Sequence, residues 1–256
     1  MATIDLFSYN GEADILELRL NILDPYVDEF RICEFQTTFS GNIKLFHYEY
    51  QKERFEKWAH KIKYYKIIDQ YTEEMIDEAR ASKYTNGEER WMHEYLQKES
   101  IKYAVTDLQD DDVIYIGDVD EIWEPREPNG IEKLKLRVYT YYLNMTSNEE
   151  FWGPIRALYK DVKDKVFNEI RNDTTLRTPD YQGWHFTNQG GVTAVKQKVI
   201  DQYNTVLFNG QLIHDGIEER FGKTDFVGRS FNLEVDEKNW PEYLKNNRQQ
   251  FIKMLK

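Results

Sequence analysis

Short apolar segments alternate with helix-like segments through the first half of this 256-residue chain, and this alternation restricts the fold more than any other feature. The expected strands are short runs rich in apolar residues, at 3–7, 27–35, 64–68 and 113–116. The expected helices lie between them, at 12–23, 48–61 and 88–106. Strands separated by helices indicate an α/β fold, with a central, mostly parallel but mixed sheet flanked by helices.

The second half of the chain has a different pattern. Its expected strands are at 135–143, 151–159 and 183–186, and its expected helices are at 211–220 and 240–256. No Pro, Gly or Ser-rich linker separates the two halves. We therefore expect a single domain over residues 1–256.

The charge of the chain limits its partners. The formal net charge is -12, from 34 basic and 46 acidic side chains. A negative field repels nucleic-acid phosphates and anionic lipid, so we expect no nucleic-acid partner. An anionic small substrate would need a cation or local Arg and Lys side chains to neutralise it. Aromatic residues make up 15% of the chain, and their flat faces suit sugar rings as well as a protein core.

The sequence shows neither a disulfide framework nor a membrane segment. Cys33 is the single cysteine, so no intramolecular disulfide can form. No apolar run approaches the length of a membrane span, and the first residues lack the basic and apolar regions of a signal peptide. We expect a cytoplasmic protein.

The Asp118-Val119-Asp120-Glu121 segment directly follows the expected strand at 113–116. Ligands of parallel α/β sheets gather at the carboxyl ends of the strands. In extended chain, Asp118 and Asp120 would point to the same side about 7 Å apart, and both could reach one divalent cation. Such a cation could bridge the phosphates of a nucleotide diphosphate sugar, and Gly117 would let a ligand approach closely.

Two other interpretations of this segment remain open from the residues alone. An acidic cluster can be a solvated loop. Haloacid-dehalogenase-like phosphatases also place Asp-x-Asp after an apolar strand, with the first Asp as nucleophile. Their pattern continues with Thr or Val two residues after the second Asp, where this chain has Ile122. Their motif also lies near the N-terminus, whereas the strand here is the fourth.

Seven segments in order resemble glycosyltransferase family 17. They are Asp5-Leu6-Phe7 with Asn10 to Leu20, Glu34 with Thr38 to Gly41 and Lys44, Trp91 with Glu94, Asp112 with Gly117 to Ile122, Gly183 to Phe186, Gly222 with Asp225 and Gly228-Arg229, and Trp240 to Leu244 with Asn247. The resemblance spans nearly the whole chain.

This resemblance implies a GT-A-like fold, a UDP-sugar donor, a saccharide or glycan acceptor and a divalent cation, Mn²⁺ or Mg²⁺. It implies transfer with inversion, of N-acetylglucosamine in the best-known member. By analogy, Asp118 faces the ribose or a metal-bound water and Asp120 holds the metal directly. We expect the chain to depart from the family in lacking a membrane anchor, and it carries Gln97-Lys98 where the family has Gln-Arg.

Further site residues are suggested by their positions and chemistry, and for His185 also by the resemblance. His185 is a candidate metal ligand, with His214 as a weaker rival, and Trp184 could stack on a sugar or pack in the core. The other candidate donor contacts are Asn10 and Glu12, which could also cap a helix, and Glu94. Lys44 and Arg229 could contact the diphosphate or be solvated surface charges. Arg19, in the middle of its helix, is expected to pair with a carboxylate beneath the sheet end.

An inverting transfer needs a carboxylate that takes the proton of the acceptor hydroxyl. Asp225, Glu121 and Glu34 are the candidates for this general base. We therefore expect a metal-dependent inverting glycosyltransferase that moves N-acetylglucosamine from UDP to a saccharide hydroxyl. The alternatives are a non-catalytic nucleotide-sugar or glycan-binding protein of the same fold and an Asp-nucleophile phosphatase.

Overall fold

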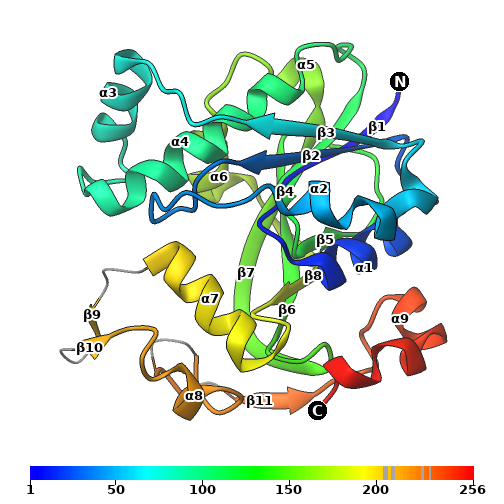
Figure 1. The fold of residues 1–256 in the computed structure, drawn as a ribbon. Helices are drawn as coiled ribbons and strands as arrows, with labels where there is room; N and C mark the ends of the chain where they lie inside the picture. The colour runs from blue at the N-terminus through cyan, green and yellow to red at the C-terminus, as the bar shows by residue number, and fades with distance from the viewer. Residues whose placement is uncertain (204–206, 209–210, 226–227, 231) are drawn as a thin grey trace.

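Four parallel strands form the half of the sheet in which the sequence pattern was clearest. The computed structural model describes all residues except 204–206, 209–210, 226–227 and 231. The four strands are β1 (Thr3–Ser8), β2 (Glu29–Phe35), β3 (Ile62–Ile67) and β4 (Val113–Asp118). They lie in the order β3-β2-β1-β4, with every neighbouring pair parallel, as expected (Figure 1).

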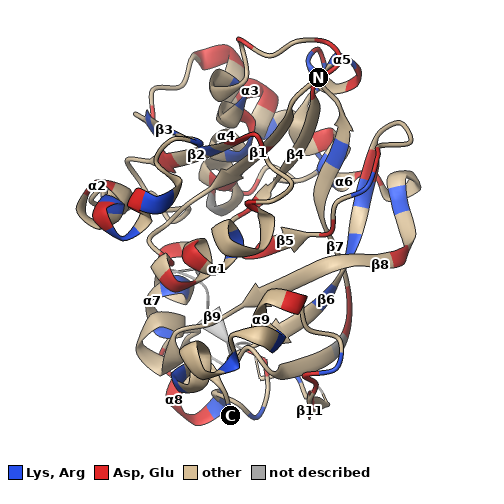
Figure 2. Ribbon diagram, turned by 90° about the vertical axis from the view of Figure 1, so that its right-hand side faces the viewer, with Lys and Arg blue, Asp and Glu red and all other residues tan. Residues whose placement is uncertain are grey.

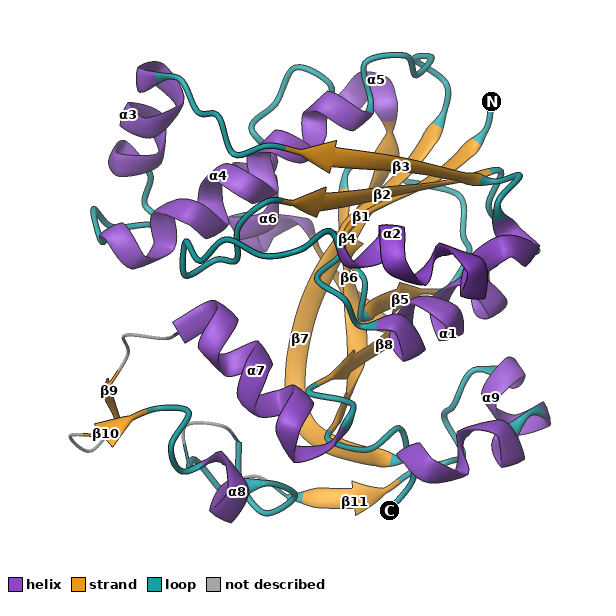
Figure 3. Ribbon diagram, in the orientation of Figure 1, coloured by secondary structure: helices purple, strands orange, loops and turns teal. Residues whose placement is uncertain are grey.

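Helices cover both faces of these strands because side chains of a strand alternate between the two faces. In β1, Phe7 joins the apolar cluster that contains α1 (Ala13–Leu23). Ile4 and Leu6 join the opposite cluster, which contains residues of η3 (Ile101–Ala104) and α6 (Phe167–Asn172). The fold is therefore mixed α/β with its sheet between helical layers (Figure 3).

The remaining helices of the first half differ in length from the expectation. The segment expected as one helix at 48–61 is α2 (His47–Gln51) followed by the 3-10 helix η1 (Lys52–Trp58). The segment at 88–106 is η2 (Glu89–Trp91), α4 (Met92–Ser100) and η3. The short helix α3 (Glu73–Ala81) was not expected, although Thr72 caps it by accepting a hydrogen bond from the Met75 amide.

The second half continues the sheet with mostly antiparallel strands. These are β5 (Glu121–Trp123), β6 (Glu132–Thr140), β7 (Met145–Leu158), β8 (Arg177–Thr187) and β11 (Leu233–Val235). The order continues β4-β7-β6-β8-β5, with β11 beside β7. Among the described residues, four strand pairings of this sheet are parallel and four are antiparallel. The sheet is therefore mixed, but it is not mostly parallel, contrary to the expectation.

The sheet curls in this half. The register of β6 shifts between Lys133 and Lys135 and again between Arg137 and Tyr139, and such irregularities bend and twist a strand. The long strand β7 curves from beside β4 down to β11 (Figure 1).

The helices of the second half lie around the curled strands. They are α5 (Tyr159–Val162), α6, η4 (Thr174–Leu176), α7 (Gly191–Tyr203), α8 (Ile217–Arg220), α9 (Glu242–Asn246) and η5 (Arg248–Met254). Of the helix expected at 211–220, only the end is helical, as α8. Its start was wrong, because β10 (Gln211–Leu212) pairs with β9 (Leu207–Phe208) and a turn follows it. The helix expected at 240–256 is divided at Asn247, whose backbone leaves the helical region.

Acidic and basic residues are interspersed along most helices and strands (Figure 2). No helix among the described residues is long and apolar enough to cross a membrane.

Candidate functional site

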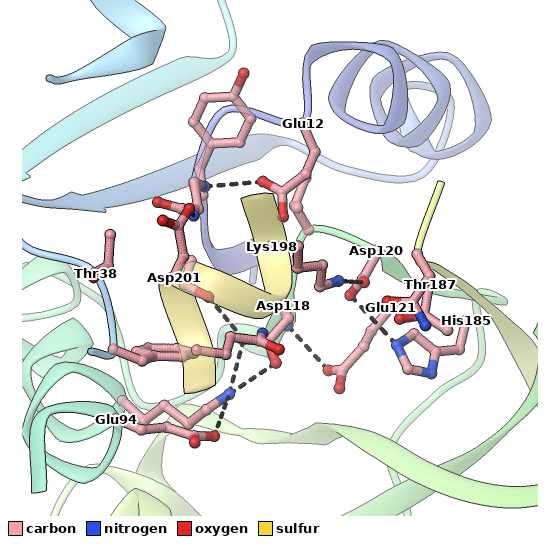
Figure 4. A pocket seen from close by; sticks show the side chains of 18 of the residues that line it. Glu12, Thr38, Glu94, Asp118, Asp120, Glu121, His185, Thr187, Lys198 and Asp201 are labelled. Atoms are coloured by element: carbon pink, nitrogen blue, oxygen red, sulfur yellow. Dashed lines mark hydrogen bonds and ion pairs between the residues drawn. The ribbon is translucent and has the colours of Figure 1, made fainter. Parts of the chain in front are cut away.

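A cavity of about 480 Å³ lies at the carboxyl ends of β1 and β4, with α7 on its opposite side (Figure 4). Its walls come from segments that are far apart in the chain. The lining includes Ser8, Asn10, Glu12, Thr38, Lys44, Glu94, Lys98, Asp118, Asp120, Glu121, Phe151, Arg171, His185, Thr187, Lys198, Asp201, Asp225 and Arg229. The structure thus brings most of the predicted site residues to one cavity.

The floor of the cavity is a turn that Arg19 holds from beneath. Nη1 of Arg19 donates to the backbone carbonyls of Asp118 (3.0 Å), Val119 (3.2 Å) and Glu121 (2.8 Å). Its Nε and Nη2 donate to the two carboxylate oxygens of Asp5, at 2.8 and 2.6 Å. Arg19 and Asp5 are fully buried. The prediction that Arg19 pairs with a carboxylate beneath the sheet end is confirmed.

The turn at Val119–Asp120 corrects the expectation of an extended segment, and the two aspartates have separate partners. Asp118 accepts hydrogen bonds from Ser8 Oγ (2.7 Å), Lys98 Nζ (2.8 Å) and Arg171 Nη2 (2.9 Å).

Asp120 instead faces α7 and β8. Its Oδ2 accepts from Lys198 Nζ at 2.8 Å, and its Oδ1 lies 3.5 Å from Nε2 of His185 (Figure 4).

These cations keep both aspartates ionised. Burial alone would raise the pKa of Asp118, but the charges of Lys98 and Arg171 outweigh it and hold that pKa well below the usual range. Burial likewise opposes ionisation of Asp120, and Lys198 and His185 hold its pKa well below the usual range. The site therefore presents carboxylates, not carboxylic acids, at neutral pH.

Glu121 lines the cavity but its carboxylate is engaged in holding other groups. Oε2 accepts from the Asp118 amide at 3.0 Å, and Oε1 accepts from Arg171 Nη2 at 2.8 Å. The carboxylate lies between Gly117 and Gly153, where an added Cβ would come within 2.7 and 2.6 Å of its oxygens. Gly117 therefore makes room for Glu121 rather than for a ligand. Glu121 is suited to orient Arg171 and not to take a proton.

Glu34 lies outside the cavity, so the structure does not support it as a general base. Its carboxylate is fully buried and accepts from Lys44 Nζ (2.9 Å), the backbone amides of His47 (2.6 Å) and Tyr48 (3.0 Å), and Tyr64 Oη (2.9 Å). Two of these donors are at the start of α2. Glu34 therefore holds the N-terminus of that helix and Lys44.

Trp184 also lies outside the cavity. Successive residues of β8 face opposite sides of the sheet, so His185 points into the cavity while Trp184 packs in the main core. Nε1 of Trp184 donates to the backbone carbonyl of Asn239 at 2.6 Å. Of the two interpretations of Trp184, core packing agrees with the structure and sugar stacking does not.

Asn10 and Glu12 lie at the cavity wall nearest α7. Nδ2 of Asn10 donates to Asp201 at 3.1 Å, and its backbone amide donates to Glu12 at 3.0 Å. Neither side chain caps α1, because the cap of that helix has no side-chain hydrogen bond. Burial raises the pKa of Glu12. The charge of Asp120 raises this pKa further, and the charge of Lys198 lowers it.

Of the remaining predicted residues, Glu94, Asp225 and Arg229 line the cavity and His214 does not. Glu94 is 3.9 Å from Lys98 Nζ, across from Asp118. Asp225 accepts a 2.7 Å hydrogen bond from the Arg229 amide and forms an ion pair with its guanidinium, so these two predicted residues are partners. His214 does not line the cavity and lies 3.5 Å from Asp215.

Arg171, Lys198 and Asp201 are among the described cavity residues that the sequence did not identify as functional. Arg171 comes from α6, and Lys198 and Asp201 come from α7, neither of which was expected as a helix. Their partners are 50 or more residues distant in the chain, so no local pattern links them.

Asp120 and His185 fit a divalent cation. Cis ligands of an octahedral ion with bonds of about 2.1 Å are about 3 Å apart, close to the observed 3.5 Å between Oδ1 and Nε2. The His185 ring stacks on Phe151, with 4.1 Å between centroids. Within the described part of the chain, no group of three or more His, Cys, Asp or Glu side chains is arranged to hold a metal ion. A two-ligand site suits Mg²⁺ or Mn²⁺, because substrate phosphates and water complete such sites.

A comparison with protein families matches the part of the chain that forms the cavity floor. A family model described as glycosyltransferase family 17 matches residues 2–188, which covers the cavity floor and both proposed metal ligands. The segments around Asp225 and Trp240 lie beyond this match. A comparison with curated proteins gave no match.

Proposed function

The chain belongs to glycosyltransferase family 17, and we propose that it moves N-acetylglucosamine from UDP to a saccharide hydroxyl, with inversion and with a divalent cation. Family membership makes the protein a glycosyltransferase, with a sugar donor and a glycan acceptor. An Asp-nucleophile phosphatase is therefore no longer an alternative.

One observation carries the finer proposal. The turn after β4 brings Asp120 opposite His185, on the floor of a cavity whose described lining also contains five cationic side chains, those of Lys44, Lys98, Arg171, Lys198 and Arg229. This arrangement suits a nucleotide diphosphate sugar. The cation, when bound by Asp120 and His185, would neutralise charge on the leaving diphosphate. The parallel strands β1 to β4, with the acidic turn at their carboxyl ends, support a GT-A type of fold.

The other side chains of the cavity have distinct roles in this proposal. Asn10 and Glu12 bind the nucleoside, because their polar groups line the wall beside the end of β1. Lys98 and Arg171 stabilise the phosphates on the opposite side of the turn. Glu121 orients Arg171 from below, at 2.8 Å.

Asp225 is the general base in this proposal. Of the three candidates, Glu34 lies outside the cavity and Glu121 is buried against Asp118 and Arg171. Asp225 lines the cavity from a segment distant from the floor, and its partner Arg229 is mostly exposed. A carboxylate oxygen of Asp225 would take the proton of the acceptor hydroxyl as that oxygen attacks the anomeric carbon.

Release of UDP from a panel of UDP-sugars with a saccharide acceptor tests the proposal. We expect release with Mn²⁺, loss of release with EDTA, and loss in Asp120→Ala. Asp77→Ala is a matched control, since Asp77 is exposed on α3, does not line the cavity and pairs with Arg80 at the surface. Metal-independent turnover, or full activity in Asp120→Ala, would overturn the metal site. Binding of UDP-sugar with no turnover on any acceptor would instead favour the non-catalytic alternative.

A further inference from the structure

Lys198 pairs with the carboxylate of Asp120, beside the position where a divalent cation held by Asp120 and His185 would be expected. Its Nζ lies 2.8 Å from Oδ2 of Asp120, on the carboxylate that also faces His185 (Figure 4). Glu12 lies nearby and contributes to the field around Lys198. The ammonium group thus lies against the one carboxylate, that of Asp120, which a divalent cation would use.

The helix that carries Lys198 is fixed across the cavity by contacts that do not involve Lys198. Ser40 donates from its amide to the Asp201 carbonyl (2.8 Å) and from Oγ to the Ile200 carbonyl (2.9 Å). These carbonyls belong to the last turn of α7, where helical carbonyls lack intrahelical partners. The other side of α7 packs through Val195 and Val199 in a small apolar cluster. The Lys198 side chain can therefore move while α7 stays in place.

We propose that Lys198 is a built-in counter-ion for Asp120, which a divalent cation must displace in order to bind. This inference rests on the proposed function. An ion about 2.1 Å from Oδ1 and an ammonium at 2.8 Å from Oδ2 would be about 4–5 Å apart, where like charges repel strongly at a partly buried site. The diphosphate of the donor gives Lys198 a new anionic partner at the same place. Lys198 thus weakens the binding of the ion alone and favours its binding together with the donor.

Binding of Mn²⁺ to the protein without donor, followed by electron paramagnetic resonance of the free ion, tests this inference. We expect Lys198→Met to lower the Kd for Mn²⁺ about tenfold or more relative to the native chain, because it removes one positive charge beside the ligand. Lys196→Met is the matched control, since Lys196 is on the same helix, is not part of the cavity lining and pairs with Glu218 at 3.9 Å. Its Kd should stay within twofold.

A second measurement uses the native chain and does not depend on the variant folding. Lys198 should be acylated slowly by an amine-reactive ester while it pairs with Asp120, and several times faster when Mn²⁺ displaces it. Mass spectrometry of the peptide that carries Lys198 measures this rate, with Lys196 as internal reference. An unchanged or slower rate in saturating Mn²⁺ would overturn the displacement.

The outcomes separate this inference from the proposed function. Tighter binding in Lys198→Met supports the counter-ion role. Equal or weaker binding in Lys198→Met overturns that role and leaves the metal site intact. Absence of Mn²⁺ binding in the native chain and in both variants, with UDP present as well, overturns the metal site and the counter-ion role together.

Discussion

Replacement of Arg19 by Met tests whether the cavity floor depends on the buried ion pair beneath it. Arg19 gives five hydrogen bonds, two to the Asp5 carboxylate and three to carbonyls of the turn. All of them are made by a fully buried side chain. Met keeps much of the apolar volume of the Arg stem and removes every donor.

The expected cost follows from what the substitution leaves without a partner. The Asp5 carboxylate would lose both hydrogen bonds from Arg19 and keep the one from Trp123 Nε1, at 2.8 Å. Removal of one partner of a buried ion pair costs about 3–5 kcal/mol. Three buried carbonyls would also lose their shared donor, so we expect a value near the upper end, about 5 kcal/mol. This is a large part of the stability of a typical domain.

A double variant separates the ion pair from the turn. An isolated buried pair can often be replaced by apolar residues at little cost. The turn carbonyls remain without a donor in Asp5→Leu with Arg19→Met, so we expect about 2–3 kcal/mol of destabilisation to persist. Urea unfolding followed by tryptophan fluorescence measures both values. The control is Arg54→Met, which breaks surface pairs with Asp14 and Glu17 and should cost under about 1 kcal/mol.

Two results would refute this reasoning. If Arg19→Met costs no more than Arg54→Met, the buried pair does not stabilise the fold. If the double variant recovers the full native stability, the contacts of Arg19 with the turn carry no weight, and the floor of the cavity is held by other means.

Three further predictions follow. Burial lowers the pKa of Lys133 from 10.5 to about 8, so the unfolded chain binds more protons between these values and stability should rise with pH across that range. Lys133→Met should therefore raise Tm more at pH 7 than at pH 10, as thermal unfolding at both values would show. Gly153→Ala places a Cβ 2.6 Å from Oε1 of Glu121, and should cost about 1–3 kcal/mol in urea unfolding and weaken UDP binding in a titration. Glu34→Gln should lower Tm and leave kcat of the folded protein unchanged, whereas Asp225→Asn should lower kcat about 10²–10⁴-fold with a smaller change in Tm.

The strands β1, β2 and β4 could be predicted because they are largely buried on both faces, whereas β3, at the end of the sheet, is more exposed. Strands buried on both faces are short apolar runs that a sequence shows directly, and β1 to β4 lie within two residues of the expected segments at both ends. The acidic turn could be placed at the carboxyl end of β4 for the same reason. Its conformation could not be predicted, because the turn is held by Arg19, a residue about 100 positions earlier in the chain.

The face of a strand was harder to predict than its position. Trp184 and His185 are adjacent in β8, so alternation alone requires that they face opposite sides. It does not say which of the two faces the cavity. That choice is set by the pairing of β8 with β5, in which His185 lies opposite Glu121 and Trp184 lies opposite the buried Ile122.

The helix α7 was missed for a physical reason. Its sequence contains several β-branched residues, which occur in strands as readily as in helices. Gly190 and Gly191, both with positive φ, come directly before and at its first residue and resemble a loop. The importance of Lys198 depends on a contact with Asp120 across 78 residues of the chain. No feature near Lys198 in the sequence points to that contact.

The net charge of -12 suggested that a cation is needed because the protein itself is acidic. The cavity gives a different reason. Asp118 pairs with Lys98 and Arg171, and Asp120 pairs with Lys198, so the chain neutralises its own carboxylates. A bound cation is then not required to reduce repulsion by these aspartates, and its charge is available for the departing diphosphate. When the donor enters, Lys198 could move from Asp120 to a phosphate oxygen. The Asp120 carboxylate would then be available to the divalent cation while the diphosphate is bound. The side chain that obstructs the ion in the absence of donor is thus suited to make ion binding depend on the donor.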